Sequence, residues 1–323
     1  MSRPAVSVII PTYNRANFLR LALDSLARQS YRDFETIVVD DGSTEDTESV
    51  VRDHPVSARF IRQSRGGPAL ARNHGVAESS ADTIAFLDSD DEWLPTKLER
   101  FRAAMSNRPD VRIWYGPMNP IDRNGHLVAG RTKACQGGWI TNALFHSSFV
   151  HVPSVVMHRA VFEEFGGFNP RLPVCEDYDL WLRTSTRYEF GLVPEPLALR
   201  RLHDQRLSKA CMRRNLAVKA DVLEAFAQSP NARSILESNS VNRRIARVML
   251  AAARSALRDH HSRDAESLAA RARTYGASAI RTGGLSTLAR LSRWLGIDRT
   301  PPEPAPVAEP RLPVQNVQAV KSR

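Results

Sequence analysis

Four short runs of apolar, largely β-branched residues recur in the first 87 residues, at 6–10, 36–39, 58–61 and 83–87. Runs of this kind fill strands that are covered on both faces of a sheet. The segment Arg15–Gln29 between the first two places its apolar residues on one face of a helix. Strands that alternate with helices at this spacing predict an α/β fold with a Rossmann-like, mostly parallel central sheet flanked by helices.

Polar residues follow three of these predicted strands. Because ligands bind beyond the carboxyl ends of parallel strands, we expect Pro11–Asn14, Asp40–Ser43 and Asp88–Asp91 to lie along one edge of the sheet. The first turn reads PTYNRA and lacks the G-x-G-x-x-G pattern, so a Rossmann dehydrogenase is disfavoured. The chain also lacks the G-x-x-x-x-G-K-[ST] pattern of a P-loop.

The turn after the fourth strand is strongly acidic and lies in the stretch AFLDSDDEW, Ala85–Trp93. Asp88, Asp90 and Asp91 place three carboxylates within four residues. Unpaired carboxylates this close repel one another, and a divalent cation completed by phosphate oxygens removes that conflict. The alternative is a solvated acidic turn that caps the helix beginning at Pro95.

A second acidic pair, Glu176 and Asp177, stands in the stretch CEDYDLWLR. Helical spacing places Asp177, Leu180 and Trp181 near one face, so a carboxylate in the first turn can point at a site. The alternative is simple N-terminal capping with stabilisation by the helix dipole. His203 follows a last predicted strand over 195–202, a place where a lone histidine is usually a packed or surface residue.

Six stretches occur in a characteristic order: VSVIIPTYNR, VVDDGSTEDT, GGPALARNHGV, AFLDSDDEW, FGGFN and CEDYDLWLR. Over about residues 4–207 this order and spacing resembles the family 2 inverting nucleotide-sugar glycosyltransferases, which have the GT-A fold. The resemblance implies a metal-dependent inverting transfer of a sugar from a nucleotide-diphosphate sugar donor to a hydroxyl of a glycan or lipid-linked acceptor. It further implies a place in cell-surface polysaccharide biosynthesis.

The same resemblance implies roles for individual residues. Tyr13 is expected to stack on the nucleotide base, Asp41 to accept a base N–H, and Asp177 to act as general base with Glu176 beside it. The full set implied for the nucleotide and diphosphate is Pro11, Thr12, Tyr13, Asp40, Asp41, Arg72, Asp88 and Trp181. The set implied for Mg²⁺ or Mn²⁺ is Asp88, Asp90, Asp91 and His203.

Two other functions are compatible with such a fold. A sugar-1-phosphate nucleotidyltransferase normally carries a glycine-rich basic first loop, whereas PTYNRANF contains no glycine. A catalytically silent nucleotide- or glycan-binding protein would be expected to lose its acidic residues first, whereas both acidic sets are intact.

Localisation is predicted to be cytoplasmic. The apolar run at the N-terminus is broken by Pro11, and no run approaches the roughly 18 apolar residues of a membrane span. Three cysteines, Cys135, Cys175 and Cys211, form no C-x-x-C pair, which favours a reducing compartment and disfavours a zinc site.

Charged residues are distributed unevenly along the 323-residue chain. Residues 1–204 contain 24 Lys and Arg against 26 Asp and Glu, whereas residues 205–323 contain 21 against 9. We therefore predict a catalytic domain over 1–207, a basic all-helical extension over 208–298 and a Pro-rich disordered tail over 299–323. Aromatic residues are rare in the basic part, which disfavours a nucleic-acid partner.

Two predicted helices in the basic part are amphipathic, which suggests peripheral attachment to an anionic membrane surface. The alternative is that both helices pack on the catalytic domain and leave their arginines in solvent. The first predicted helix places apolar residues on one face and arginines on another, namely Val241, Ile245, Val248, Met249, Ala252 and Ala256 against Arg243, Arg247, Arg254 and Arg258. The second predicted helix places Arg290 and Arg293 on the face opposite its apolar residues, namely Leu288, Leu291, Trp294 and Leu295.

Overall fold

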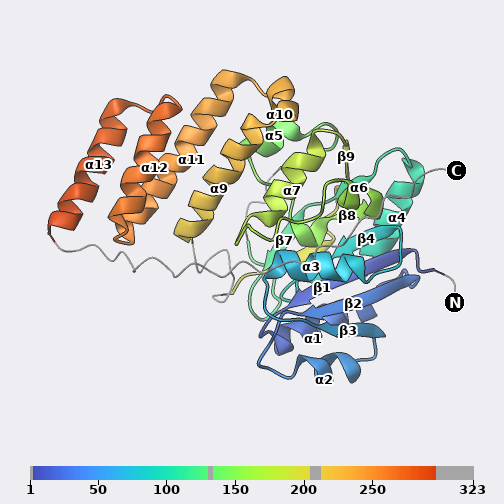
Figure 1. Cartoon of the computed structure of the whole chain (residues 1–323). Coiled ribbons are helices and arrows are strands. Elements are labelled where there is room, and N and C mark those ends of the chain that lie inside the picture. The colour runs from blue at the N-terminus through green and yellow to red at the C-terminus, as the bar shows by residue number, and fades with distance from the viewer. Residues whose placement is uncertain (1–2, 130–133, 204–211, 296–323) are drawn as a thin grey trace, which may run out of the picture.

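The computed structural model describes residues 3–129, 134–203 and 212–295 (Figure 1). A seven-stranded sheet with the order β3-β2-β1-β4-β8-β6-β9 forms its centre. Neighbouring strands are parallel except at β8, which runs antiparallel to both β4 and β6, so the predicted mostly parallel sheet is confirmed. The strands are β1 (Val6–Thr12), β2 (Phe34–Asp40), β3 (Ala58–Arg62), β4 (Thr83–Phe86), β6 (Ile113–Tyr115), β8 (Val156–His158) and β9 (Phe190–Leu192).

Helices cover both faces of this sheet because its strands are apolar on both sides. In β1, Val8 and Ile10 contribute to one buried cluster and Ile9 to another, as the alternation of side chains in a strand requires. The helices connecting the strands are α1 (Ala16–Ala27), α2 (Thr47–Arg52), α3 (Pro68–Ala77), α4 (Lys97–Asn107), α5 (Thr141–His146), α6 (Arg159–Glu164) and α7 (Glu176–Ser185).

Helix α3 lies unusually close to β1. A Cβ atom at Gly75 would stand 2.5 Å from Cγ2 of Ile9, a distance that real contacts do not reach. Glycine at this position therefore lets the helix backbone approach the strand. The close packing fixes Arg72, one turn earlier on the same helix, over the carboxyl edge of the sheet.

A small second sheet, in the order β5-β10-β7, lies beyond the acidic turn. Its strands are β5 (Glu92–Trp93), β7 (Met118–Ile121) and β10 (Ala198–Arg201). The pair Asn124-Gly125 predicts a hairpin over 119–138. The described residues of this range form a turn at Asn124-Gly125 with an antiparallel bridge from Ile121 to Leu127, and β7 pairs with β10 instead.

The apolar pattern over His151–Met157 predicts a strand, and this prediction is wrong in its first half. Residues Val152–Ser154 form a 3₁₀ turn, η1, and β8 begins only at Val156. Pro153 stands in the middle of the turn, and its ring nitrogen cannot donate a ladder hydrogen bond.

The C-terminal helices are α9 (Met212–Gln228), α10 (Pro230–Ile235), α11 (Ser238–Arg258), α12 (Ser262–Thr274) and α13 (Ala279–Trp294). The long helices α9, α11, α12 and α13 stand side by side in a row beside the sheet, and the short α10 joins α9 to α11 (Figure 1). The apolar face predicted for α11 is buried and its four predicted arginines are exposed, so both predictions are confirmed. The predicted tail over 299–323 lies outside the described residues.

The hydrophobic core does not stop at the predicted domain boundary near residue 207. Phe226 of α9 packs on Phe145 of α5 with ring centroids 6.1 Å apart. One buried cluster runs from Ile9 and Phe86 in the sheet through Trp181 to Met249 in α11. The first helices of the extension thus share their core with the sheet domain.

Helix α13 keeps an apolar face in solvent. Ile280 is 87% exposed and Trp294 81%, and Leu288, Leu291 and Leu295 are exposed beside them. Arg290 and Arg293 face Glu266 of α12 instead. Within the described residues, no helix combines the length and hydropathy needed to cross a bilayer.

Candidate active site

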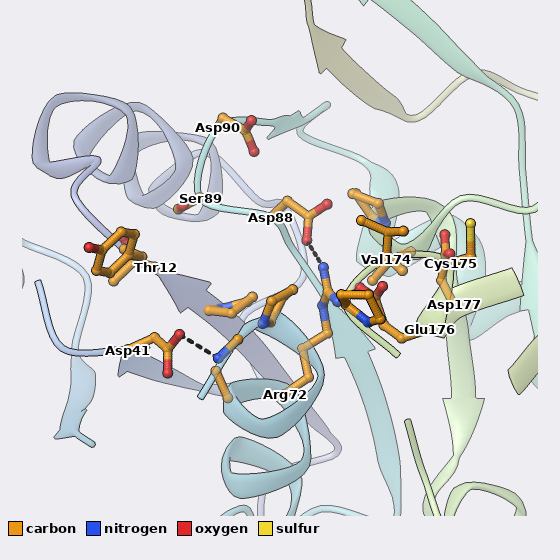
Figure 2. Close-up of a pocket in the computed structure, with 18 of the residues that line it drawn as sticks. Thr12, Asp41, Arg72, Asp88, Ser89, Asp90, Val174, Cys175, Glu176 and Asp177 are labelled. Carbon is orange, nitrogen blue, oxygen red and sulfur yellow. Dashed lines mark hydrogen bonds and ion pairs between the residues drawn. The ribbon is translucent and has the colours of Figure 1, made fainter. Parts of the chain in front are cut away.

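A cleft of about 1100 Å³ opens at the carboxyl edge of the sheet. Its walls come from the loops after β1, β2 and β4, from α3, from the start of α7, and from α9. Figure 2 shows Thr12 and Asp41 at one end, Arg72 and Asp88 between the two ends, and Cys175 and Asp177 at the other end. Three loops far apart in sequence therefore meet, as the strand pattern predicted.

The end formed by β1 and β2 contains Tyr13 and Asp41. The guanidinium carbon of Arg65 lies 4.3 Å from the centroid of the Tyr13 ring. The Asp41 carboxylate accepts hydrogen bonds from the backbone N–H groups of Gly66 at 2.7 Å and Gly67 at 2.8 Å. Asp41 thereby ties the loop after β2 to the start of α3 and shapes this end of the cleft, which Pro11 and Thr12 also line.

Asp40 and Trp181 do not line the cleft, and this corrects their assignment to the nucleotide pocket. The Asp40 carboxylate is fully buried and accepts hydrogen bonds from Thr47 Oγ1 and from Arg62 Nε, each at 3.0 Å. The Trp181 ring is fully buried and packs edge-on against Phe168. Both side chains hold the framework of the site together.

The acidic turn brings its three carboxylates together. Each of Asp88, Asp90 and Asp91 offers one carboxylate oxygen, and these three oxygens lie within 4.8 Å of one another. Three carboxylate oxygens form a hard donor set, which fits Mg²⁺ or Mn²⁺. Two of these side chains are also held by neighbours, because Asp90 pairs with Arg15 at 2.9 Å and Asp91 accepts from the backbone N–H of Arg201 at 2.9 Å.

His203 joins this turn through Asp90. Its Nε2 lies 2.8 Å from Oδ2 of Asp90, and its ring packs on Phe18 with centroids 4.7 Å apart. The group of carboxylates that could hold a metal ion does not include His203. His203 therefore lies beside the acidic turn with its nitrogen directed at the Asp90 carboxylate, and its role as a metal ligand stays a prediction.

Arg72 bridges the two acidic sets. Its guanidinium donates to Asp88 Oδ1 and to Glu176 Oε1, both at 2.7 Å, and the side chain is buried. Burial lowers the pKa of Arg72, but the charges of Asp88 and Glu176 outweigh this effect and raise it. The cation that the sequence assigned to the diphosphate therefore also connects the acidic turn to the start of α7.

Asp177 lies in the first turn of α7, after Cys175 in the left-handed conformation with φ 62°. Its carboxyl is partly buried. Burial, together with the charge of Glu176, raises the pKa of Asp177 to about 7. A carboxylate with a pKa near neutral can accept a proton from a substrate hydroxyl more readily than an ordinary aspartate.

Several cationic lining residues were missed by sequence reasoning, among them Arg15, Arg65, Arg171, Arg214 and Lys219. Arg15 and Arg65 had local signals, since Arg15 directly follows PTYN and Arg65 precedes Gly66-Gly67. Lys219 had none, because it belongs to α9, and only the shared core brings that helix to the cleft.

Solved structures of similar fold extend over most of the chain. The structure of Staphylococcus aureus TarS 1–349 in complex with UDP-GlcNAc has a TM-score of 0.64 and 16% identity, covering 90% of this chain and 92% of that one. The mannosyltransferase PcManGT from Pyrobaculum calidifontis, in complex with GDP-Man and Mn²⁺, has a TM-score of 0.58 and 20% identity, covering 91% and 81%. The fold is thus GT-A-like, the architecture of nucleotide-sugar glycosyltransferases.

Sequence comparison narrows this class to a family. Residues 7–164 match the family described as Glycosyl transferase family 2. An uncharacterized glycosyltransferase of Rickettsia felis is 30% identical over 220 residues, which are 66% of this chain and 36% of that relative. A relative from Nostoc is 39% identical over 127 residues, 38% of this chain and 39% of the relative. Residues 7–164 therefore form a glycosyl transferase family 2 domain. The chain spans 36–39% of the length of these two relatives.

Proposed function

We propose that this glycosyltransferase moves a sugar, with inversion, from a nucleotide-diphosphate sugar to a hydroxyl of a glycan or lipid-linked acceptor. The observation that carries the proposal is the single cleft, which joins Tyr13 and Asp41, the three carboxylates of the acidic turn, and Asp177. Tyr13 offers a ring for the base. Asp177 lies at the end of the cleft opposite Thr12 and Asp41, where an acceptor hydroxyl would approach.

Asp88, Asp90 and Asp91 would hold Mg²⁺ or Mn²⁺. When bound, the cation neutralises negative charge that develops on the departing nucleoside diphosphate. Asp177 takes the proton of the acceptor hydroxyl as the oxygen attacks the anomeric carbon from the face opposite the leaving group. A single displacement of this kind inverts the configuration and needs no covalent enzyme intermediate.

The basic helices support a place at the cytoplasmic face of a membrane, in cell-surface polysaccharide synthesis. Arginines at 243, 247, 254 and 258 are exposed on α11, and α13 exposes Ile280 and Trp294. Exposed basic residues are attracted to anionic lipid headgroups, and exposed aromatic residues suit the interface. We propose that this surface brings the cleft to a lipid-linked acceptor.

The test is a thermal-shift screen of nucleoside diphosphates and nucleotide sugars with Mn²⁺ or Mg²⁺, followed by assays of sugar release with and without metal. A ligand that binds only the folded chain raises its melting temperature. We expect a metal-dependent shift and metal-dependent turnover. Binding without turnover would favour the silent binding protein, and pyrophosphate release from a nucleoside triphosphate with a sugar 1-phosphate would favour the nucleotidyltransferase.

Asp90→Asn tests the metal assignment, with Asp53→Asn as its matched control because Asp53 is an exposed aspartate outside the cleft. We expect Asp90→Asn to remove the metal dependence of nucleoside diphosphate binding and to abolish transfer, because a ligand carboxylate is lost. Isothermal titration calorimetry of the nucleoside diphosphate with and without Mn²⁺ measures this metal dependence. Undiminished metal dependence in Asp90→Asn would show that the cation binds elsewhere.

A further inference from the structure

We propose that the acceptor carries a phosphate group near the hydroxyl that is glycosylated, and that Arg171, Arg214 and Lys219 bind this phosphate at the Asp177 end of the cleft. All three residues line the cleft. The inference rests on the proposed function, since it names the chemistry of the acceptor for the same site.

The position of these cations assigns them to the acceptor. Arg171 belongs to the loop that leads into α7, four residues before Cys175. Asp41 and Thr12 lie at the far end of the cleft, with Arg72 and Asp88 in between. A donor that occupies the nucleotide end and the acidic turn leaves the Asp177 end for the second substrate.

Helix α9 is held against the start of α7, which brings its cations to that end. The Cys175 thiol lies 3.8 Å from the carbonyl oxygen of Asn215. Lys219 Nζ is 4.8 Å from the centroid of the Tyr178 ring, next to Asp177 in the chain. Burial raises the pKa of the Cys175 thiol to about 12, and Lys219 opposes that rise, so its charge reaches the first turn of α7.

The lining of this end suits an anion better than an uncharged sugar. Among the described lining residues, the only Tyr, Phe or Trp is Tyr13, at the nucleotide end. The Asp177 end therefore lacks the aromatic surface on which small-molecule pockets usually rely, and offers guanidinium and ammonium donors instead. These donors match phosphate oxygens, and arginine can bind them with two hydrogen bonds.

Two acceptors share this chemistry, a phosphodiester of a soluble polymer and the phosphate of a lipid carrier. The test uses the full chain saturated with Mn²⁺ and the nucleoside diphosphate that binds best, so that the donor end is filled. Isothermal titration then compares glycerol 3-phosphate with glycerol, and geranyl phosphate with geraniol, below their micellar concentrations. We expect only the phosphates to bind, and the tighter of the two identifies the source.

Charge reversals locate the phosphate. We expect Arg214→Glu and Lys219→Glu each to weaken phosphate binding about tenfold or more, as loss of a charged hydrogen bond implies. Arg20→Glu is the control, since Arg20 is exposed on α1 and does not line the cleft. Lys219→Met, which keeps the length of the side chain, serves if Lys219→Glu does not fold.

Nucleotide binding by the same samples separates two kinds of failure. If no variant and no wild-type sample binds nucleotide, the proposed function is wrong. If nucleotide binds normally while glycerol binds as well as its phosphate, or while Arg214→Glu and Lys219→Glu leave phosphate affinity unchanged, the phosphate site is wrong and the proposed function stands.

Discussion

Asp177 carries a pKa of about 7, raised by burial and by Glu176, and this value makes its role testable by pH. A general base must be deprotonated to act. We therefore expect turnover to rise with pH, with a midpoint near 7, and to level off above it. Steady-state rates at saturating donor between pH 5 and 9 measure this profile.

Replacing the carboxyl should separate chemistry from binding. We expect Asp177→Asn to lower turnover by about 10²-fold or more, with nucleotide and metal affinity nearly unchanged. Asp179→Asn is the matched control, since Asp179 pairs with Arg183 on the same helix at 2.8 Å and does not line the cleft. A loss of donor affinity in Asp177→Asn with turnover preserved would assign Asp177 to binding.

Lys97 also has an altered pKa. Its side chain is fully buried over the rings of Trp93 and Phe101, and Nζ donates to the carbonyl of Ser154 beside the cleft. Burial lowers the pKa of Lys97 to about 7. The folded chain therefore binds fewer protons than the unfolded chain between about pH 7 and the ordinary lysine pKa near 10.4.

In that window stability must rise with pH, because the unfolded state holds more protons there. We expect the free energy of unfolding to increase from pH 7 to pH 10, and Lys97→Met to remove this part of the increase. Urea unfolding of the wild-type chain and of Lys97→Met at pH 7 and pH 10 measures the increase in the free energy of unfolding in each protein. Equal increases in both proteins would show that Lys97 keeps an ordinary pKa in the folded state.

At the scale of single elements, α3 depends on Gly75. A Cβ at this position would meet Ile9 at 2.5 Å and Val39 at 3.2 Å, in the buried interface between helix and sheet. We expect Gly75→Ala to lower the free energy of unfolding by about 1–3 kcal/mol, as overpacking of a core does. Nucleotide affinity should fall as well, because α3 carries Arg72 and begins at the Asp41 contact.

Gly283→Ala provides the control, since a Cβ at Gly283 in α13 would meet nothing within 4 Å. This substitution should raise stability by about 0.5–1 kcal/mol, the usual gain from replacing glycine inside a helix. Thermal and urea unfolding of Gly75→Ala and Gly283→Ala measure the two changes in stability. If the two substitutions had the same effect, the approach of α3 to β1 would not depend on glycine.

The elements were predictable where the sequence pattern is local. The alternation of strands and helices up to residue 87, the acidic turn, and the buried and basic faces of α11 follow from periodicity and agree with the structure. The strand predicted over His151–Met157 was wrong in its first half, where the structure has η1. Pro153 interrupts the strand pattern there, and the apolar residues of the pattern are equally compatible with a buried turn. The assignment of Asp40 to the nucleotide pocket was wrong because adjacent side chains at the end of a strand point in opposite directions. Of the two aspartates, only Asp41 lines the cleft.

Contacts across the chain could not be read from local patterns. The pairing of β7 with β10 joins segments about 80 residues apart, and the packing of α9 on α7 brings Lys219 to the cleft. These arrangements depend on tertiary packing, which no window of sequence describes. For the same reason the sequence does not show that the described helices after the boundary predicted at 207 share a core with the sheet.

At the scale of the whole molecule, the shared core decides how membrane attachment should be tested. A chain cut near Phe226 would lose the buried partners that α11 gives to α9, so its failure to bind vesicles would be ambiguous. Substitution of exposed residues avoids this problem. Arg243, Arg247, Arg254 and Arg258 can be changed to Glu together, because all four are exposed.

We expect the wild-type chain to sediment with anionic vesicles at low salt and to be released at high salt, since each basic residue near such a surface contributes about 1 kcal/mol. The fourfold variant should sediment much less. Neutral vesicles and circular dichroism of the variant are the controls. Equal sedimentation of both proteins on anionic vesicles would exclude the α11 face as the binding surface.

Arg72 has a consequence for how relatives of this chain can diverge. It is a buried cation between Asp88 and Glu176, so changing it alone leaves two acids without their counter-charge, at a cost of about 3–5 kcal/mol for a broken buried pair. Changing either acid alone leaves the arginine short of one partner. The three positions should therefore be inherited as a unit, kept together or replaced together, even in descendants that use a different donor or acceptor.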